Sequence, residues 1–353
     1  MADVFLHPSY DEHEQVLFVS DRSCGLRGII ALHDTTLGPA AGGCRMYPYA
    51  SEEAALKDVL RLSRGMTMKN ALAGLPLGGG KCVIIADPAA ANKHDLLRAL
   101  ARQVQRLGGR YWTAIDVGVG PADVDVMAEE CEFVFTRASE FADDDPPAHY
   151  TALGGFHGIR ALAAYLRGAD NLAGLKVAVQ GVGQTGADLI GQLVAAGAEL
   201  VATDVNEAAL RRVVEQHGIR AVAPDAIYDQ DVDVFAPCAL GGILNDDTIR
   251  RLRCKGIAGL ANNQLERPEH GRALMERGIA YAPDFVVNAG GVMRGSLPIF
   301  AAHDRDLALR KIKGIYDTVL EILRRSEAEG VPAEEIAERI ALERIRGGHA
   351  MAA

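Results

Sequence analysis

A strand–turn–helix–strand unit near the middle of the chain constrains the fold more than any other feature. The apolar segment "LKVAVQ" (175–180) reads as a buried strand, and "GVGQTG" (181–186) follows it directly. The helical pattern "ADLIGQLVAAG" then leads to a second strand, "AELVATD", which ends at Asp204. Strands that alternate with helices at this spacing predict a parallel βαβ unit within an α/β fold.

The glycines and the acidic residue of this unit predict a dinucleotide site. Gly181 permits the tight turn, Gly183 lets the backbone approach a pyrophosphate, and Gly186 allows close helix–strand packing. The helix that follows offers N–H groups and a positive dipole to the diphosphate. Asp204 would accept hydrogen bonds from the adenosine ribose and repel a 2′-phosphate. We therefore expect the cofactor to be NAD rather than NADP.

A second glycine-rich stretch, "GLPLGGGKC" (74–82), does not fit a phosphate-binding loop. The GxxxxGK[ST] pattern requires Gly at position 75 and Ser or Thr at position 82, but the chain has Leu75 and Cys82. No hydroxyl is therefore placed to bind Mg²⁺. We interpret these glycines as allowing tight backbone packing that projects Lys81 into a cleft.

Hydrophobic patterns predict the remaining elements. Strands are expected at "QVLFV", "GIIAL", "CVIIAD" and "RYWTAID", with a helix between the last two at "HDLLRALARQVQRLGG". Ser51 is a plausible N-cap, and Pro121 suits the first turn of a further helix. Apolar residues at helical spacing predict one helix over 309–323, stopped by Gly330 and Pro332.

The acidic, proline-containing segment "FADDDPPAHY" (141–150) interrupts this alternation and is interpreted as a solvated loop at a domain boundary. A chain of 353 residues is long enough for two cores. We predict an N-terminal domain over 1–147, a Rossmann domain over 148–305, and a C-terminal helical region over 306–353 that returns toward the first domain.

Bulk properties exclude several classes of protein. A net charge of −10 disfavours nucleic acids and anionic membranes as partners. The chain has no long apolar run and no signal-peptide pattern at its start, so no membrane span or secretion is expected. Its six cysteines include no CxxC pair, which predicts reduced thiols in the cytoplasm and no metal site.

Several motifs, in the same order, resemble the leucine/phenylalanine/valine dehydrogenases, which belong with glutamate dehydrogenase in one superfamily. They are "HDTTLGPAAGGCRMYPY", "GMTMKNALAGLPLGGGKCVI", "DVFAPCALGGILNDDTI", "AGLANNQL" and "YAPDFVVNAGGV". The resemblance implies a substrate-binding and oligomerisation domain at the N-terminus, a Rossmann NAD domain, and assembly as a homo-oligomer, a dimer or a multiple of it. It also implies the reversible oxidative deamination of an L-amino acid to its 2-oxo acid and ammonia.

The same resemblance assigns roles to individual residues. Lys69 would bind the substrate carboxylate, Lys81 would be the catalytic base, and Asp116 would assist proton transfer. A further set would line the sites for substrate side chain and nicotinamide: Asn262, which contacts substrate or nicotinamide, Thr151 and Asn288 near the nicotinamide, and Ala41, Ala114 and Val292 beside the substrate.

The residue types suit this chemistry. A lysine can act as a base if burial and a neighbouring ammonium lower its pKa, although Asp116 acts in the opposite direction. The alternatives are a solvated charge for each lysine and a helix cap for Asp116. His33 and His157 are interpreted as structural. A catalytically silent NAD-binding homologue and a P-loop phosphotransferase are weaker alternatives for the whole chain.

Two departures from the family pattern bear on the substrate. Ala41 stands where the family usually has Leu, and Gly295 stands near a usual Val. An enlarged pocket would favour Phe or Trp, with Leu behind, because an unfilled gap forfeits about 0.8 kcal/mol per methylene. Alternatively, the segment 293–300 refills the space with Leu297 or Phe300 while Arg294 adds charge, and the substrate is Leu or Val.

Overall fold

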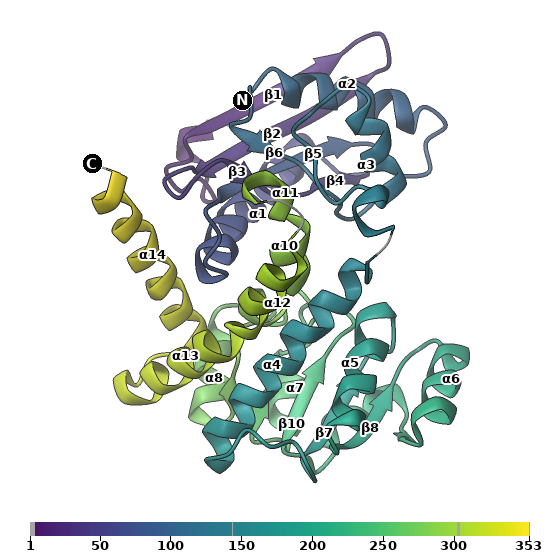
Figure 1. The fold of residues 1–353 in the computed structure, drawn as a ribbon, viewed down its shortest axis with the longest axis vertical. Helices are drawn as coiled ribbons and strands as arrows, with labels where there is room; N and C mark the ends of the chain where they lie inside the picture. Colours follow the sequence, from purple (N-terminus) through teal and green to yellow (C-terminus); the bar gives the residue numbers. More distant parts are fainter. Residues whose placement is uncertain (1–3, 143, 302–303, 353) are drawn as a thin grey trace. The chain divides into compact units, whose positions relative to one another are not determined.

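The protein is described by a computed structural model over residues 4–142, 144–301 and 304–352. The chain forms two compact units (Figure 1). Unit 1 comprises Met1–Asp144, Gly295–Asp304 and Ala341–Ala353, and unit 2 comprises Asp145–Arg294 and Arg305–Ile340. The chain first passes from one unit to the other within the segment 141–150, between Asp144 and Asp145.

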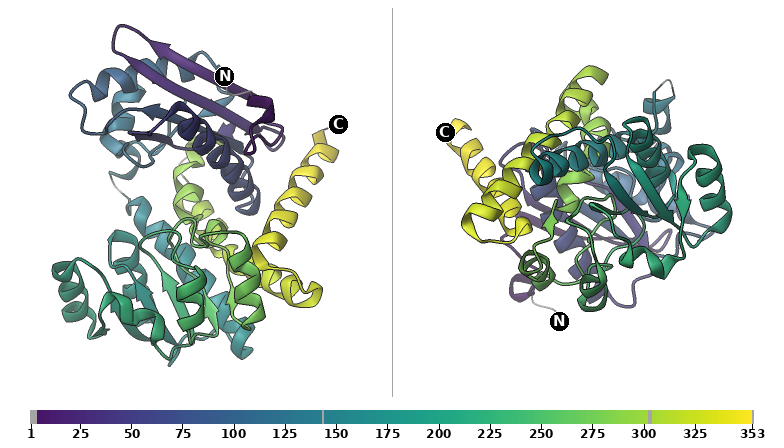
Figure 2. Two further views of the ribbon diagram at one scale, coloured as in Figure 1. Left: turned by 180° about the vertical axis from the view of Figure 1, so that it is seen from behind. Right: turned by 90° about the horizontal axis from the view of Figure 1, so that it is seen from below.

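Unit 1 is built on a mixed sheet with the order β1-β2-β5-β3-β6, in which β4 also pairs with β5. The long strands β1, β2 and β5 are antiparallel, whereas β3, β4 and β6 add parallel pairs. Figure 2 shows β1 and β2 as a long hairpin near the N-terminus. The strands are β1 (Gln15–Asp21), β2 (Leu26–Asp34), β3 (Ala40–Ala41), β4 (Cys44–Tyr47), β5 (Gly78–Ile85) and β6 (Tyr111–Trp112).

Strand alternation on β2 places two hydrophobic cores on opposite faces of this sheet. Ile30 and Leu32 belong to one core, with buried residues of α2 (Lys93–Gln105) and α3 (Pro121–Ala128). Ile29 and Ala31 belong to the other core, with buried residues of α1 (Glu52–Leu72). Both faces of β2 are therefore covered by helices, as its nearly continuous apolar sequence requires.

Helix α1 begins and ends as its sequence predicts. The Ser51 hydroxyl accepts a hydrogen bond from the backbone N–H of Ala54 at 3.1 Å, which caps the N-terminus. Glu52 and Glu53 lie in the first turn, where a negative charge complements the helix dipole. Pro121 likewise occupies the first turn of α3, so both predicted helix starts are confirmed.

Unit 2 contains a fully parallel sheet with the order β12-β11-β10-β7-β8-β9. Counted from β7, this is the strand order 3-2-1-4-5-6 of the doubly wound dinucleotide-binding fold. Ligands of such sheets bind where the strand order reverses, here between β7 and β10. The strands are β7 (Lys176–Gln180), β8 (Glu199–Thr203), β9 (Arg220–Ala221), β10 (Val234–Pro237), β11 (Gly256–Ile257) and β12 (Ala280–Tyr281). The predicted α/β fold with a Rossmann domain is confirmed.

Helices pack around this sheet in unit 2 (Figure 1), whereas α11 and the part of α14 from Ala341 onward belong to unit 1. The predicted helix over 309–323 is interrupted at Gly314, whose N–H is shared between the carbonyls of Arg310 and Lys311. Gly330 ends the following helix with a left-handed φ of 65°, as predicted. The helices are α4 (Pro147–Arg167), α5 (Gln184–Ala195), α6 (Glu207–His217), α7 (Asp246–Arg251), α8 (Glu269–Glu276), α9 (Asp284–Val287), α10 (Gly290–Gly295), α11 (Leu297–Phe300), α12 (Arg305–Lys313), α13 (Ile315–Glu329) and α14 (Ala333–Ala352).

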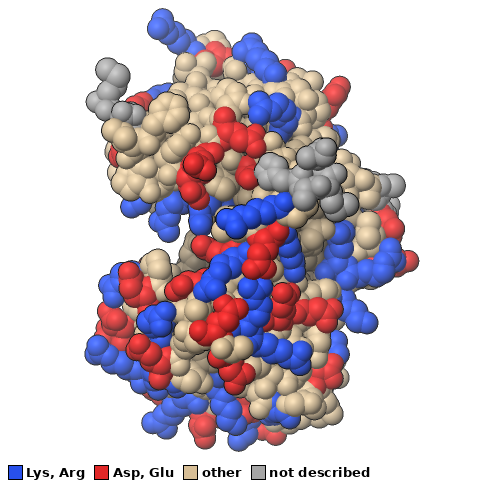
Figure 3. Space-filling model, turned by 90° about the vertical axis from the view of Figure 1, so that its left-hand side faces the viewer, with Lys and Arg blue, Asp and Glu red and all other residues tan. Residues whose placement is uncertain are grey.

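The surface carries charges of both signs. On the face drawn in Figure 3, Lys and Arg side chains are interspersed with Asp and Glu and do not gather into one broad basic patch. Within the ranges that the structure describes, no helix has the length and hydropathy needed to cross a membrane.

Candidate active site

In unit 1, the buried Lys81 forms an ion pair with the half-buried Asp116. The Lys81 Nζ lies 2.8 Å from the Asp116 Oδ2, and the two side chains are 7% and 20% exposed. Lys81 comes from the middle of β5, and Asp116 comes from the loop between β6 and α3. Because Gly120 is the N-cap of α3, Asp116 is not a helix cap, and that alternative is wrong.

The glycines before Lys81 lie in strand β5, not in a loop. A Cβ atom on Gly79 would lie 2.1 Å from the backbone nitrogen of Thr67 on α1, and one on Gly80 would lie 2.6 Å from the Tyr111 ring. Only glycine permits this approach of α1 and β6 to the strand. The run 78–80 therefore packs the backbone around Lys81 and forms no anion cradle.

A third charged group completes the site in unit 1. The Arg45 Nε donates to the Asp116 Oδ2 at 3.0 Å, so this oxygen accepts from both cations. Burial would raise the pKa of Asp116, but the charges of Lys81 and Arg45 outweigh it and lower the pKa to about 2. Asp116 is therefore a carboxylate throughout the neutral and alkaline range.

The other residues that the sequence assigns to substrate binding in unit 1 lie on neighbouring backbone. Ala41 and Ala114 are buried, and Lys69 lies half-buried in the last turn of α1. The Asn70 amide, next to Lys69, donates to the carbonyl of Gly78 at 2.6 Å and to that of Ala41 at 3.4 Å. This side chain therefore ties the end of α1 to both β3 and the start of β5.

The glycine loop of unit 2 has a different geometry. Gly181 has a φ of 102°, and a Cβ atom there would lie 2.8 Å from the Cβ of Ala239, which follows β10. A Cβ on Gly186 would lie 2.1 Å from the carbonyl oxygen of Gly181, so the loop folds tightly on the first turn of α5. By contrast, a Cβ on Gly183, the N-cap of α5, would meet nothing within 4 Å.

Asp204 follows β8 and anchors this loop. Its Oδ2 accepts from the backbone N–H of Val182 at 2.7 Å, and its Oδ1 accepts from that of Asn206 at 2.8 Å. Each carboxylate oxygen has further lone pairs, so these bonds leave acceptor capacity for ribose hydroxyls. The loop glycines, the N-terminus of α5 and Asp204 therefore fit the diphosphate and ribose of a dinucleotide.

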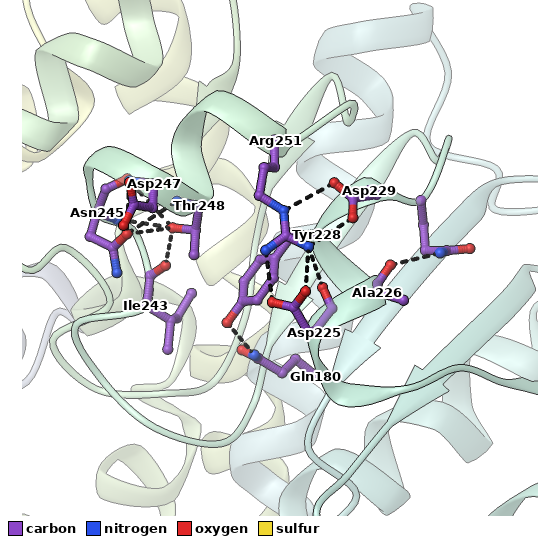
Figure 4. A network of polar contacts seen from close by, with 11 residues as sticks. Gln180, Asp225, Ala226, Tyr228, Asp229, Ile243, Asn245, Asp247, Thr248 and Arg251 are labelled. Carbon is purple, nitrogen blue, oxygen red and sulfur yellow. Dashed lines mark hydrogen bonds and ion pairs between the residues drawn. The ribbon is translucent and has the colours of Figure 1, made fainter.

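A polar network supports the strand that precedes the loop (Figure 4). The Gln180 side chain, at the end of β7, donates to the Tyr228 hydroxyl at 2.7 Å. The Arg251 guanidinium lies 5.4 Å from the centre of the Tyr228 ring and binds the carboxylates of Asp225 and Asp229. This network joins α7 and the 3-10 turn Pro224–Asp229 to the end of β7.

The residues assigned to the nicotinamide side also lie in unit 2. The Asn288 amide donates to the Asn262 Oδ1 at 2.8 Å, so the structure brings these two side chains together. The Thr151 hydroxyl donates to the carbonyl of Pro147 at 3.0 Å, and a Cβ on Gly291 would lie 2.5 Å from that hydroxyl oxygen. Val292 follows on α10 and is half-buried.

The structure corrects the expectation that Gly295 enlarges a pocket. A Cβ atom on Gly295 would lie 2.7 Å from the Cγ2 of Thr136, so that methyl group already fills the space. Thr136 has a φ of 64°, which is unusual for a β-branched residue, and its hydroxyl accepts from the N–H of Ile115 at 3.1 Å. Leu297 is fully buried, and the Arg294 guanidinium lies 5.9 Å from the centre of the Tyr150 ring.

Three residues of the site were missed from the sequence: Arg45, Asn70 and Thr136. Arg45 stands inside the quoted motif "GGCRMYPY" and directly follows Cys44, which pairs with Cys82 next to Lys81. The available signal was a charged residue in a segment that could pair with the strand of Lys81. Asn70 directly follows Lys69. Thr136 carries no sequence signal, because its role depends on its backbone conformation.

The remaining titratable groups do not form a second centre in the part of the chain that the structure describes. His33 Nδ1 lies 2.8 Å from the Thr67 hydroxyl, and burial lowers the pKa of His157 to about 4. All six cysteines are free. Among the described residues, no group of three or more His, Cys, Asp or Glu side chains is placed to hold a metal ion.

Comparisons with known proteins identify the family of this chain. The model of the Glu/Leu/Phe/Val dehydrogenase dimerisation domain matches residues 13–133, and that of glutamate/leucine/phenylalanine/valine dehydrogenase matches residues 204–346. Leucine dehydrogenase of Bacillus subtilis (strain 168) is 47% identical over 97% of this chain and 94% of its own length. Valine dehydrogenase of Streptomyces virginiae is 46% identical over 96% and 95%.

A solved structure extends the likeness to three dimensions. The crystal structure of L-tryptophan dehydrogenase from Nostoc punctiforme is 44% identical and has a TM-score of 0.86. The match covers 96% of this chain and 97% of that one. With matches in sequence and fold along nearly its whole length, this chain belongs to the glutamate/leucine/phenylalanine/valine dehydrogenase family.

Proposed function

We propose that this protein catalyses the NAD-dependent, reversible oxidative deamination of a large apolar or aromatic L-amino acid to its 2-oxo acid and ammonia. The reaction class follows from the family, whose leucine, phenylalanine and valine dehydrogenases are NAD-dependent. The observation that carries the proposal for this chain is the ion pair between the buried Lys81 and the half-buried Asp116, because it supplies a base and its charge partner.

Each protein group has a distinct task in this proposal. Lys69 binds the substrate carboxylate, and Asn262 and Asn288 orient the reacting end of the amino acid and the nicotinamide. Lys81, when neutral, removes a proton from the water that attacks the imino carbon. Asp116 stays ionised and stabilises Lys81 once it carries that proton. NAD, when bound, accepts the hydride from Cα.

The size of the substrate side chain rests on Ala41. The residue is fully buried, and it stands where the family usually carries the longer Leu. A larger apolar substrate would recover contact that a shorter one forfeits, at about 0.8 kcal/mol per methylene. Gly295 no longer supports this choice, because Thr136 occupies its space. The contact between Thr136 and the Cβ position of Gly295 favours the second candidate, in which the substrate is Leu or Val.

The direct test is a comparison of amino acids with the purified wild-type enzyme. NADH formation is followed with L-Val, L-Leu, L-Phe and L-Trp, and kcat/KM is determined for each. We expect Phe or Trp to lead. A preference of about tenfold or more for Leu or Val would correspond to about 1.4 kcal/mol and would select the second candidate. No NADH with any amino acid would contradict the proposed activity itself.

We also propose that the protein is a homo-oligomer, a dimer or a multiple of it, in the cytoplasm. Unit 1 matches a dimerisation-domain model, and the edge strand β1 leaves Phe18 60% exposed. An exposed apolar edge strand is a surface that natural proteins normally cover. Light scattering should give a mass above that of one chain, and Phe18→Lys should lower it. A wild-type monomer at working concentration contradicts this proposal.

A further inference from the structure

Arg45 lies between the ion pair of the site and a second carboxylate. Its Nε donates to the Asp116 Oδ2 at 3.0 Å, and its Nη1 donates to the Asp58 Oδ2 at 2.9 Å. The Tyr49 hydroxyl donates to the same Asp58 oxygen at 2.6 Å. Arg45 therefore bridges two carboxylates from different elements, one on α1 and one in the loop after β6.

The position of Arg45 on its strand is fixed by the sheet. Strand β4 pairs in parallel with β5, so that Cys44 is opposite Cys82 and Arg45 is opposite Val83. The Arg45 side chain is 22% exposed, and Asp58 is 30% exposed. Both residues line a cavity of about 470 Å³ in unit 1. The cavity is bordered by Arg45, Tyr47, Tyr49, Ala54, Lys57, Asp58, Arg61 and Val117.

We propose that Arg45 is a positioning residue. Its ion pair with Asp116 holds that carboxylate in place and weakens the attraction of the carboxylate for the Lys81 ammonium, so that Lys81 loses its proton more readily. An ionised Asp116 with Lys81 as its one cation would hold the ammonium strongly, and a protonated lysine cannot act as a base. Because Arg45 binds the same carboxylate oxygen, the attraction between Asp116 and the Lys81 ammonium is weaker. Asp58 in turn sets how much of the Arg45 charge is available. This inference rests on the proposed function.

The sign of the effect differs between the two partners. When the Arg45 charge is removed, the ion pair between Asp116 and Lys81 is strengthened. A higher pH is then needed to remove the proton from Lys81. Removing the Asp58 charge leaves more of the Arg45 charge for Asp116, so a lower pH suffices. Other titratable groups around the pair are Tyr49, the thiols of Cys44 and Cys82, and Lys57 and Arg61 of α1, which line the same cavity. All of them are present in both variants. Burial and Asp58 raise the pKa of Tyr49, and Arg45 lowers it, so the two variants change the pKa of Tyr49 in opposite directions as well.

The experiment is the pH profile of kcat/KM for oxidative deamination of the best amino acid by the full-length enzyme. In Arg45→Met the acid limb should move about one unit to higher pH, which lowers kcat/KM about tenfold on that limb. Arg45→Lys keeps the charge and should show less than half of this shift. Asp58→Asn should move the limb about half a unit to lower pH.

Arg61→Gln is the matched control, because Arg61 borders the same cavity and is exposed. It should leave the limb within about 0.2 units of the wild type, because water screens its charge. Opposite shifts in Arg45→Met and Asp58→Asn support the inference. Unmoved limbs, or shifts in the same direction, overturn it, whatever activity is lost. If Arg45→Met does not fold, Arg45→Lys and Asp58→Asn still give the test. A wild type without dehydrogenase activity contradicts the proposed function instead.

Discussion

The glycine-rich segments 78–80 and 181–186 differ in their place in the fold, because the first lies within strand β5 and the second spans the loop after β7 and the start of helix α5. Around Gly79, the space of a Cβ is occupied by the backbone of another element. Around Gly183, that space is open above the N-terminus of α5. A glycine position can admit a ligand where the space of its missing Cβ stays open, as at Gly183, whereas Gly79, Gly181 and Gly186 allow close packing of the protein itself.

The largest expected effect is the loss of turnover, with no change in NAD affinity, when the proposed base in unit 1 is removed. Lys81→Ala should abolish turnover, because it removes the amine that is proposed to act as the base beside Asp116. NAD affinity, measured by calorimetry, should stay near the wild-type value, because the glycine loop belongs to unit 2. Substantial remaining turnover would remove Lys81 from the role of base.

The next largest effect tests, through stability, whether the glycines of β5 are needed for packing. Gly79→Ala places a methyl group against the Thr67 nitrogen and should cost about 3 kcal/mol or more, visible in urea denaturation. Gly65→Ala is the matched control on α1, because nothing lies within 4 Å of its Cβ position. It should stabilise the protein by about 0.5–1 kcal/mol through helix propensity. Equal stabilities for the two variants would contradict the packing role of β5.

A third effect tests the open side of the comparison. Gly183→Ala should leave stability within about 0.5 kcal/mol of the wild type while weakening NAD binding, because its methyl group would occupy the path of the diphosphate.

The preference of the wild type for NAD over NADP should be relaxed in Asp204→Ala, because that variant lacks the negative charge that repels a 2′-phosphate. Equal use of both cofactors by the wild type would show that Asp204 does not face the ribose.

The smallest effect concerns a glycine whose space is filled by a movable side chain. Gly295→Ala should cost about 1–2 kcal/mol, because the Thr136 methyl group must shift. Thr136→Ser removes that methyl group, so the double variant should recover most of the loss in thermal unfolding. Simple additivity of the two single changes would mean that the residues do not interact.

The sequence predicted much of the fold, because its signals are local. The Ser51 cap and the Pro121 helix start each depend on residues within a few positions of one another, and the βαβ unit lies within about 30 consecutive residues. The ion pairs of the site are harder to predict, because Lys81, Asp116 and Arg45 come from distant segments of the sequence that the fold of unit 1 brings together. The filled space at Gly295 could not be predicted at all, since it depends on Thr136 in a left-handed conformation.

The division of the chain into units has a consequence for synthesis. Unit 1 begins at the N-terminal side but also includes Ala341–Ala353, which the ribosome makes only after all of unit 2. Arg344 in that segment donates to the backbone carbonyls of Ala71 and Leu72, at the end of the helix that carries Lys69. Domains usually fold in the order in which they emerge. Here the unit that begins to emerge first is completed last. A nascent chain halted before Arg344 would have all of unit 2, but the end of α1 would lack the two hydrogen bonds from Arg344.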